Sequence, residues 1–247
     1  MAGVKYDIIV QLHAPASEAI LKLFDEVNVK HVIVAEILPR EKNLNQWLRH
    51  PYSNRFSFIK MLQYEMVLFF DADVVFTGNP DVLFEQNLNH YDCVASGDFN
   101  SPVNGGFVLV KPSWQAYVDI EDIVNTGSFR RYMGILSVGP RLHYVTGAAS
   151  EWAFSSCDGY QGMLYYYYFR RPDHPPSKLW GDRGTPNGWI EADKVAVHFQ
   201  GEKAFNIRVV AKNMAPDRKT GMARWSELKP RVIERMNRVL GEADDLR

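Results

Sequence analysis

The stretch MVLFFDADVVF, residues 66–76, places two acidic residues directly behind an apolar run. Its first five residues favour β-structure and predict a buried strand. Asp71 and Asp73 follow with one small residue between them. Burying uncompensated carboxylates is costly, and a hard divalent cation would compensate them while leaving coordination positions for phosphate oxygens. The pattern predicts a Mn²⁺ or Mg²⁺ site for a nucleoside diphosphate at the end of a strand; the alternative is a solvated loop.

The composition is that of an ordinary globular protein. The chain has 247 residues, of which 46% are hydrophobic and 23% charged, and its formal net charge is −1. This balance gives no electrostatic reason to expect a nucleic-acid partner or an anionic membrane surface. Cys93 and Cys157 are too few for a disulfide framework or a zinc site. A cytoplasmic location is the default expectation, with a Golgi-lumenal one if the sequence belongs to a longer, membrane-anchored protein.

Apolar periodicity predicts strands that alternate with helices. This order is typical of an α/β fold, here with a single mostly parallel sheet flanked by helices. Asn54 and Asn79 are expected to cap two of the helices. Residues 170–188 are rich in proline and glycine and are expected to form a loop, whereas residues 127–156 show no clear period. The expected strands are 6–11, 32–37, 66–71, 93–96, 107–111 and 194–198, and the longer helices are 17–28, 112–124, 160–169 and 226–240.

Four further features could complete a site around the two aspartates. Asn104, Gly105 and Gly106 precede the strand at 107–111, where missing side chains would let backbone approach a ligand; a tight turn is the alternative. Gln161 opens an aromatic-rich helix. In HFQGEK, residues 198–203, an imidazole could complete a metal site and an ammonium group could neutralise phosphate. Arg55 precedes the strand that ends at Asp71, with a solvated surface arginine as the alternative.

Four blocks of the sequence are informative in their order and spacing: DADVVFTGNPDVLFE (71–85), NGGFVLVKPS (104–113), GYQGMLYYYYF (159–169) and VHFQGEKAF (197–205). Together they resemble the glycogenin-like glycosyltransferases of family 8. The spacing of Gly201 and Lys203 is similar to that in the plant glucuronosyltransferase branch of that family. The resemblance implies a nucleotide-sugar glycosyltransferase type A fold over residues 1–205, with 206–247 as a C-terminal tail whose amphipathic helix packs on the domain.

The resemblance also implies roles for individual residues. Asp71, Asp73 and His198 match the protein ligands of the family's Mn²⁺. Gln161 matches a glutamine beside the anomeric carbon, and Asp158 lies close to a position where the family has an acid. The residues expected to contact the donor substrate are Arg55, Asn104, Gly105, Gly106, Gly201 and Lys203.

Several positions depart from the family pattern. The strand at 6–11 matches the family's second strand, so the sequence resembles an N-terminally truncated member without the uridine-gripping opening unit. Tyr160 stands where the family has an aspartate. Gly105 replaces a serine, which in sequence terms is a mild change. These departures favour an alternative in which the protein is a catalytically weak or inactive member that binds sugar or nucleotide within a complex.

The leading expectation is a metal-dependent retaining glycosyltransferase that moves a hexose or hexuronic acid from a UDP-sugar to a glycan, lipid or protein acceptor. Self-association as a homodimer stays open. A third interpretation is a phosphatase or other metal hydrolase with Asp71 as nucleophile, although the flanking threonine and lysine pattern of such enzymes is absent from the sequence. The four tyrosines at 165–168 are expected to bury their rings rather than to serve as glycosylation sites.

Overall fold

The structure is a computed structural model. It describes residues 6–12, 14–33, 51–71, 74–76, 78–87, 90–97, 101–126, 128–130, 134–137, 152–154, 157, 159–180 and 196–198, with 226–227, 229–231 and 234 towards the C-terminus. The architecture over these residues is mixed α/β, as the sequence predicts. In the described part, no helix combines the length and apolar character needed to cross a membrane.

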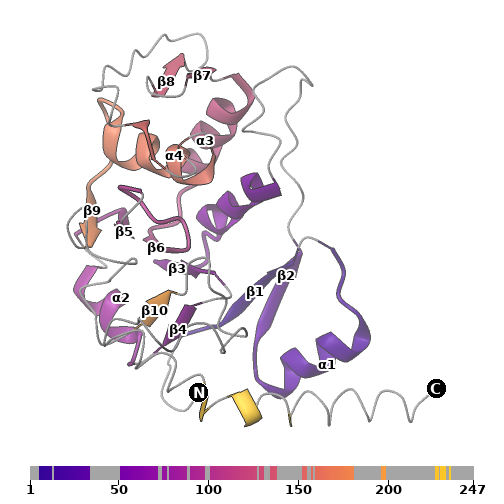
Figure 1. The fold of residues 1–247 in the computed structure, drawn as a ribbon. Coiled ribbons are helices and arrows are strands. Elements are labelled where there is room, and N and C mark those ends of the chain that lie inside the picture. The colour runs from indigo at the N-terminus through magenta and orange to yellow at the C-terminus, as the bar shows by residue number, and fades with distance from the viewer. Residues whose placement is uncertain are drawn as a thin grey trace.

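A strand–helix–strand unit comes first along the chain (Figure 1). β1 (Ile9–Leu12) and β2 (Lys30–Ile33) pair in parallel, and α1 (Glu18–Glu26) connects them. The exposed carboxylate of Asp7, just before β1, accepts hydrogen bonds at 2.6 Å from Lys30 Nζ and from the Tyr64 hydroxyl. Tyr64 therefore ties this unit to the loop that leads into β3. The expected order of strand, helix and strand is confirmed in this segment.

The largest sheet has four strands in the order β3-β6-β5-β9. β6 (Phe107–Val110) lies antiparallel to both β3 (Val67–Phe70) and β5 (Cys93–Ser96), and only β9 (Ser177–Trp180) joins β5 in parallel. The single mostly parallel sheet expected from the sequence is therefore not what the described strands form. The segment from 97 to 106 is shorter than the dozen or more residues that a parallel crossover requires, so β6 returns antiparallel to β5.

Two smaller strand pairs complete the sheets of the described part. β4 (Val74–Phe76) pairs antiparallel with β10 (Ala196–His198), and β7 (Ser128–Arg130) pairs antiparallel with β8 (Gly134–Ser137). The β7–β8 hairpin lies where the sequence shows no period. β9 corrects the expectation of a loop throughout 170–188, because its four residues find a partner in β5 despite the surrounding prolines.

The helices differ from expectation in type more than in place. A 3₁₀ helix, η2 (Pro51–Lys60), stands where a helix capped by Asn54 is expected, and Asn54 lies inside it rather than at its cap. Asn79 does cap α2 (Asp81–Asn87), since the Asp81 N–H donates to Asn79 Oδ1 at 3.0 Å. α3 (Trp114–Thr126) begins after Ser113, whose Oγ accepts from the Ala116 N–H at 3.2 Å. The described residues between 226 and 234 are helical, in agreement with the expected C-terminal helix.

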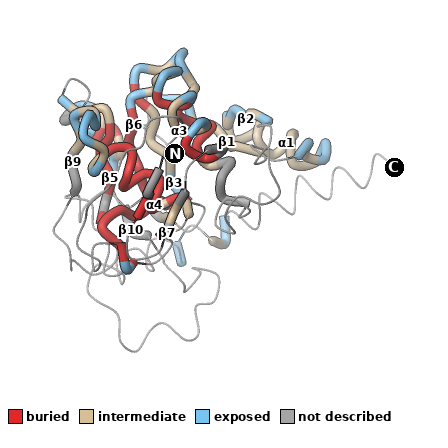
Figure 2. Tube along the Cα trace, turned by 90° about the horizontal axis from the view of Figure 1, so that it is seen from above, coloured by how far each residue is buried: buried red, intermediate tan, exposed pale blue. Residues whose placement is uncertain are grey.

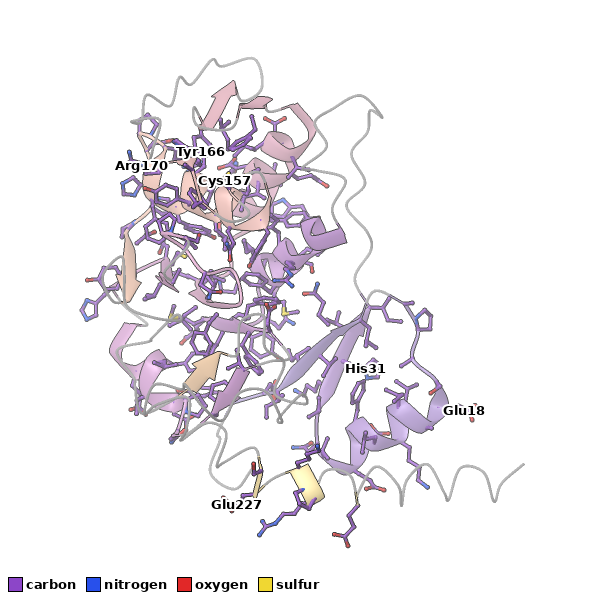
Figure 3. The ribbon with its side chains drawn as sticks, viewed as in Figure 1. Glu18, His31, Cys157, Tyr166, Arg170 and Glu227 are labelled. Carbon is purple, nitrogen blue, oxygen red and sulfur yellow. The ribbon has the colours of Figure 1, made fainter. Side chains whose placement is uncertain are left out.

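The main core lies between the four-stranded sheet and the helices η2, α3 and α4 (Figure 2). All four residues of β6 are buried. α4 (Tyr160–Tyr165) continues into a π-helical turn, η4 (Tyr166–Arg170), and the tyrosines at 165–168 are buried there, as predicted. Figure 3 shows Tyr166 and Cys157 within this body, whereas His31 and Glu18 lie on the β1–α1–β2 unit. Burial raises the pKa of the Tyr167 hydroxyl, which donates to Asp119 at 3.0 Å.

Gly134 is a position of this core where a side chain would be strained. Its φ is +74°, and a Cβ there would lie 2.4 Å from the ring of the fully buried Trp152. We expect Gly134→Ala to lower the free energy of unfolding by about 2–4 kcal/mol, from the left-handed backbone and the overpacking together. Urea denaturation with an unchanged m-value would show this. Ala153→Ser, on an exposed neighbour of Trp152, is the control and should stay within about 0.5 kcal/mol.

Candidate functional site

Asp71 follows the last residue of β3 and faces the turn that precedes β6. The register pairs Phe70 with Phe107, and the Asp71 N–H donates to the Gly106 carbonyl at 2.9 Å. Because β6 is antiparallel to β3, the amino end of β6 meets the carboxyl end of β3. The turn therefore lies at the amino end of its own strand, and the antiparallel register brings it beside Asp71.

Arg55 reaches Asp71 from η2. One guanidinium nitrogen, Nη1, lies 3.0 Å from Oδ1 and 3.2 Å from Oδ2 of the carboxylate. The two side chains are 25% and 24% exposed, so the ion pair is within reach of solvent and of a ligand. The same guanidinium lies over two aromatic rings, with Cζ 6.0 Å from the Phe69 centroid and 5.7 Å from the Tyr160 centroid. Arg55 is therefore held between a carboxylate and aromatic faces, rather than being a solvated surface arginine.

The turn before β6 is shaped by two side-chain oxygens. Asn104, which is buried, accepts a hydrogen bond at 2.7 Å from the Gly106 N–H through its Oδ1. Gln161, at the start of α4, accepts one at 3.0 Å from the Gly105 N–H through its Oε1. Segments far apart in the sequence are thus joined at one peptide group, and the Gln161 side chain is oriented by the turn.

Tyr160 packs into the centre of this arrangement. Its ring centroid lies 4.7 Å from that of Phe56 and 6.2 Å from that of Phe69. The side chain is buried, and its hydroxyl finds no hydrogen-bond partner among the described residues. Burial raises the pKa of the phenol well above its usual value, with Arg55 acting in the opposite direction. A group so placed stays neutral and cannot replace a carboxylate as a base.

The ring of Tyr160 leaves no room for a side chain at Gly105. A Cβ on Gly105 would come within 2.4 Å of two carbons of the Tyr160 ring and 3.1 Å of Gln161 Cγ. A serine at position 105 would therefore not fit beside this tyrosine. Glycine in place of serine at position 105 looks like a mild change in the sequence, but the Tyr160 ring leaves room only for glycine. Sequence reasoning missed this coupling, although the two departures lie in neighbouring blocks.

His198 comes to the same region through its backbone. β10 pairs with β4 so that His198 is opposite Val74, whose N–H donates to the Asp71 carbonyl at 3.1 Å. Residues opposite each other in an antiparallel pair have Cα atoms about 4.5–5.5 Å apart. The backbone of His198 therefore lies beside the residue that follows Asp73. The side chain of His198 is not described, and Asp73, Asp158, Gly201 and Lys203 lie outside the described residues.

The structure describes six of the residues proposed from the sequence with their contacts, and the backbone of a seventh, His198. The six are Arg55, Asp71, Asn104, Gly105, Gly106 and Gln161. Hydrogen bonds and an ion pair link Arg55 to Asp71, Asp71 to the turn, and the turn to Gln161. Within the described part of the chain, no group of three or more histidine, cysteine, aspartate or glutamate residues is arranged to hold a metal ion.

No protein-family model matches the sequence, and no curated protein matches it significantly.

The coupling between positions 105 and 160 can be measured as an interaction energy. We expect Gly105→Ser to lower the free energy of unfolding by about 1–3 kcal/mol, because the added atoms meet a buried ring. In a Tyr160→Ala background the same serine should cost much less, giving an interaction energy of about 1–2 kcal/mol in a double-mutant cycle. Urea denaturation of the four proteins provides the measurement.

Tyr160→Phe is the matched control for this cycle. It keeps the ring and removes only the unpartnered hydroxyl, so the serine penalty should persist in its presence. On its own it should leave stability unchanged or raise it by about 1 kcal/mol, because the buried hydroxyl makes no compensating bond. Equal serine penalties in the Ala and Tyr backgrounds would show that the ring is not the obstacle.

Proposed function

We propose that the protein is a metal-dependent retaining glycosyltransferase of the type A nucleotide-sugar fold, which moves a hexose or hexuronic acid from a UDP-sugar to an acceptor. The observation that carries this proposal is the contact chain from Arg55 through Asp71 and the 104–106 turn to Gln161. Asp71, the turn and Gln161 come from three separate blocks of the resemblance, and Arg55 lies outside the blocks. The resemblance assigns metal, sugar, anomeric-carbon and phosphate contacts to them in that order. Their meeting in one place supports a shared role.

The side chains expected to bind the metal suit Mn²⁺ or Mg²⁺. Asp71 presents a partly exposed carboxylate at a strand end, and carboxylate oxygens are ligands that both ions accept. Asp71 would hold the ion together with Asp73 and His198, whose strand pairs with β4 directly after the aspartates. When bound there, the ion would supply positive charge that stabilises the departing diphosphate.

The chain's own residues would bind and position the donor. Arg55 carries a permanent charge on a planar group that can form paired hydrogen bonds with phosphate oxygens. The glycine backbone at 105 and 106 allows close approach of a sugar ring. Gln161 is neutral and held by the Gly105 N–H, so it would support positive charge at the anomeric carbon rather than attack it. The transition state of glycosyl transfer resembles an oxocarbenium ion, so front-face attack depends mainly on such positioning.

A second candidate is a protein that binds the nucleotide sugar without turning it over. Tyr160 is the observation that favours it, because a buried phenol of raised pKa occupies a position where the glycosyltransferases that the sequence resembles have an acid. Any proton transfer that needs an acid at this position would be lost. Release of UDP distinguishes the two candidates: binding without release points to the second.

Asp71→Asn tests the metal-dependent function. With a panel of UDP-glucose, UDP-galactose and UDP-glucuronic acid, we expect Mn²⁺-dependent release of UDP from at least one donor. In the Asn variant this release should fall by about 100-fold or more, and calorimetry should find no Mn²⁺-dependent part of UDP binding, because an amide is a far poorer ligand than a carboxylate. Thermal stability should change little, since partly exposed ion pairs contribute about 0–1 kcal/mol.

Asp119→Asn is the control for this experiment. Asp119 also pairs with an arginine, Arg171, at 3.1 Å, but it belongs to α3 and takes no part in the contacts around Asp71. Its replacement should leave UDP binding as it is. UDP affinity that is equal in EDTA and in Mn²⁺ for the unmodified protein would contradict the proposal. Hydrolysis of phosphate monoesters without UDP release would favour the metal-hydrolase alternative.

A further inference from the structure

Arg55 binds the carboxylate that the proposed function assigns to the metal. The single nitrogen Nη1 spans both oxygens of Asp71, at 3.0 and 3.2 Å, so each oxygen has a cationic contact before any metal arrives. We propose that Arg55 is an internal counter-ion of Asp71 that makes metal binding and diphosphate binding cooperative. This inference rests on the proposed function in that it takes Asp71 as a metal ligand and a diphosphate as the anion.

A metal ion that arrives alone meets an unfavourable site. The guanidinium is charged at every accessible pH, and a divalent cation on Asp71 would lie close to it. The ion must therefore bind against this repulsion or displace Arg55 from the carboxylate. A carboxylate has lone pairs beyond those that Nη1 uses, so binding is weakened rather than blocked.

A diphosphate removes this obstacle. Its oxygens can accept paired hydrogen bonds from the guanidinium and supply negative charge between Arg55 and the metal. Arg55 can turn towards such a ligand, since its side chain is 25% exposed, while its guanidinium stays over the Tyr160 and Phe69 rings that hold it near the site. The two ligands then favour each other's binding. By linkage, the factor by which the diphosphate raises the metal affinity equals the factor by which the metal raises the diphosphate affinity.

The chain contains a second arrangement of the same chemistry that serves as a comparison. Arg171 pairs with Asp119 at 3.1 Å and lies over the Tyr167 ring, with Cζ 4.0 Å from its centroid. Asp119 also accepts hydrogen bonds from the Tyr167 hydroxyl at 3.0 Å and from Gln115 Nε2 at 2.6 Å. Its carboxylate is thus bound by several donors of the chain, which fits a structural ion pair. Asp71 differs in that the resemblance assigns it, together with Asp73 and His198, to a metal.

The test measures Mn²⁺ binding by calorimetry, with and without UDP, in the unmodified protein and in Arg55→Gln. In the unmodified protein, UDP should tighten Mn²⁺ binding by about tenfold or more, after correction for the complex that the two form in solution. Arg55→Gln should bind Mn²⁺ alone about tenfold more tightly than the unmodified protein, while UDP should change its Mn²⁺ affinity by less than about threefold. In this variant the affinity for Mn²⁺ alone should rise while the effect of UDP on it falls. Simple loss of structure would instead weaken the binding of both Mn²⁺ and UDP.

Two further variants complete the experiment. Arg55→Lys keeps a charge but lacks the planar group, so its affinity for Mn²⁺ alone should lie between those of the other two proteins. It serves as the deciding variant if Arg55→Gln does not fold, and a wild-type Mn²⁺ affinity in it would then overturn the inference. Arg171→Gln removes the comparable ion pair elsewhere and should leave Mn²⁺ and UDP binding unchanged. A gain in Mn²⁺ affinity there equal to that of Arg55→Gln would mean that net charge, and not the Asp71 contact, is responsible.

The outcomes separate this inference from the proposed function. If the unmodified protein binds UDP in a Mn²⁺-dependent way but Arg55→Gln gains no Mn²⁺ affinity, the inference is wrong and the function stands. If Arg55→Gln gains Mn²⁺ affinity while no protein binds UDP, only the repulsion between Arg55 and the metal stands, and both the cooperativity and the proposed function are wrong. Absence of Mn²⁺ binding from every variant would overturn both.

Discussion

The antiparallel pairing of β3 with β6 is the constraint on which the site depends. It places the Asp71 N–H against the Gly106 carbonyl, so the end of one strand and the start of the other form a single edge. All four residues of β6 are buried, and alternate ones pack in two different apolar clusters, so a one-residue slip would exchange the two sets and the packing enforces the register. Burial of the apolar strand β6 thus fixes the register, and the register fixes the position of the charged residue Asp71.

The second constraint is the packing of Tyr160. Its ring touches the aromatic core on one side and the Gly105 backbone on the other, and it lies under the guanidinium of Arg55. The neighbouring Gln161 holds the Gly105 N–H. The start of α4 therefore positions both the 104–106 turn and Arg55. A substitution at any one of these three places should disturb the packing of the other two. This explains in physical terms why glycine stands at 105 when tyrosine stands at 160.

The sequence predicted the parts that local chemistry decides. β3, β5 and β6 are continuous apolar runs, and Asn79 caps α2 because its side chain bonds a backbone group two residues away. Periodicity reveals neither strand direction nor the 3₁₀ form of η2. The direction of β6 follows from the short segment before it, whereas the form of η2 depends on packing partners far along the chain. β9 lies among prolines and is stabilised only by pairing with β5. For the site, the residue types were recognisable, but the contact between Tyr160 and Gly105 requires three-dimensional packing.

The partial exposure of the ion pair between Arg55 and Asp71 bears on how this contact could be exchanged for a ligand. The guanidinium lies 3.0 Å from the carboxylate and balances its charge. Because the pair is about one-quarter exposed, its contribution to stability is small, so it can be broken at little cost to the fold. A buried pair of the same kind would be too costly to open. Partial exposure is thus the condition under which a stabilising contact can also be exchanged for a ligand.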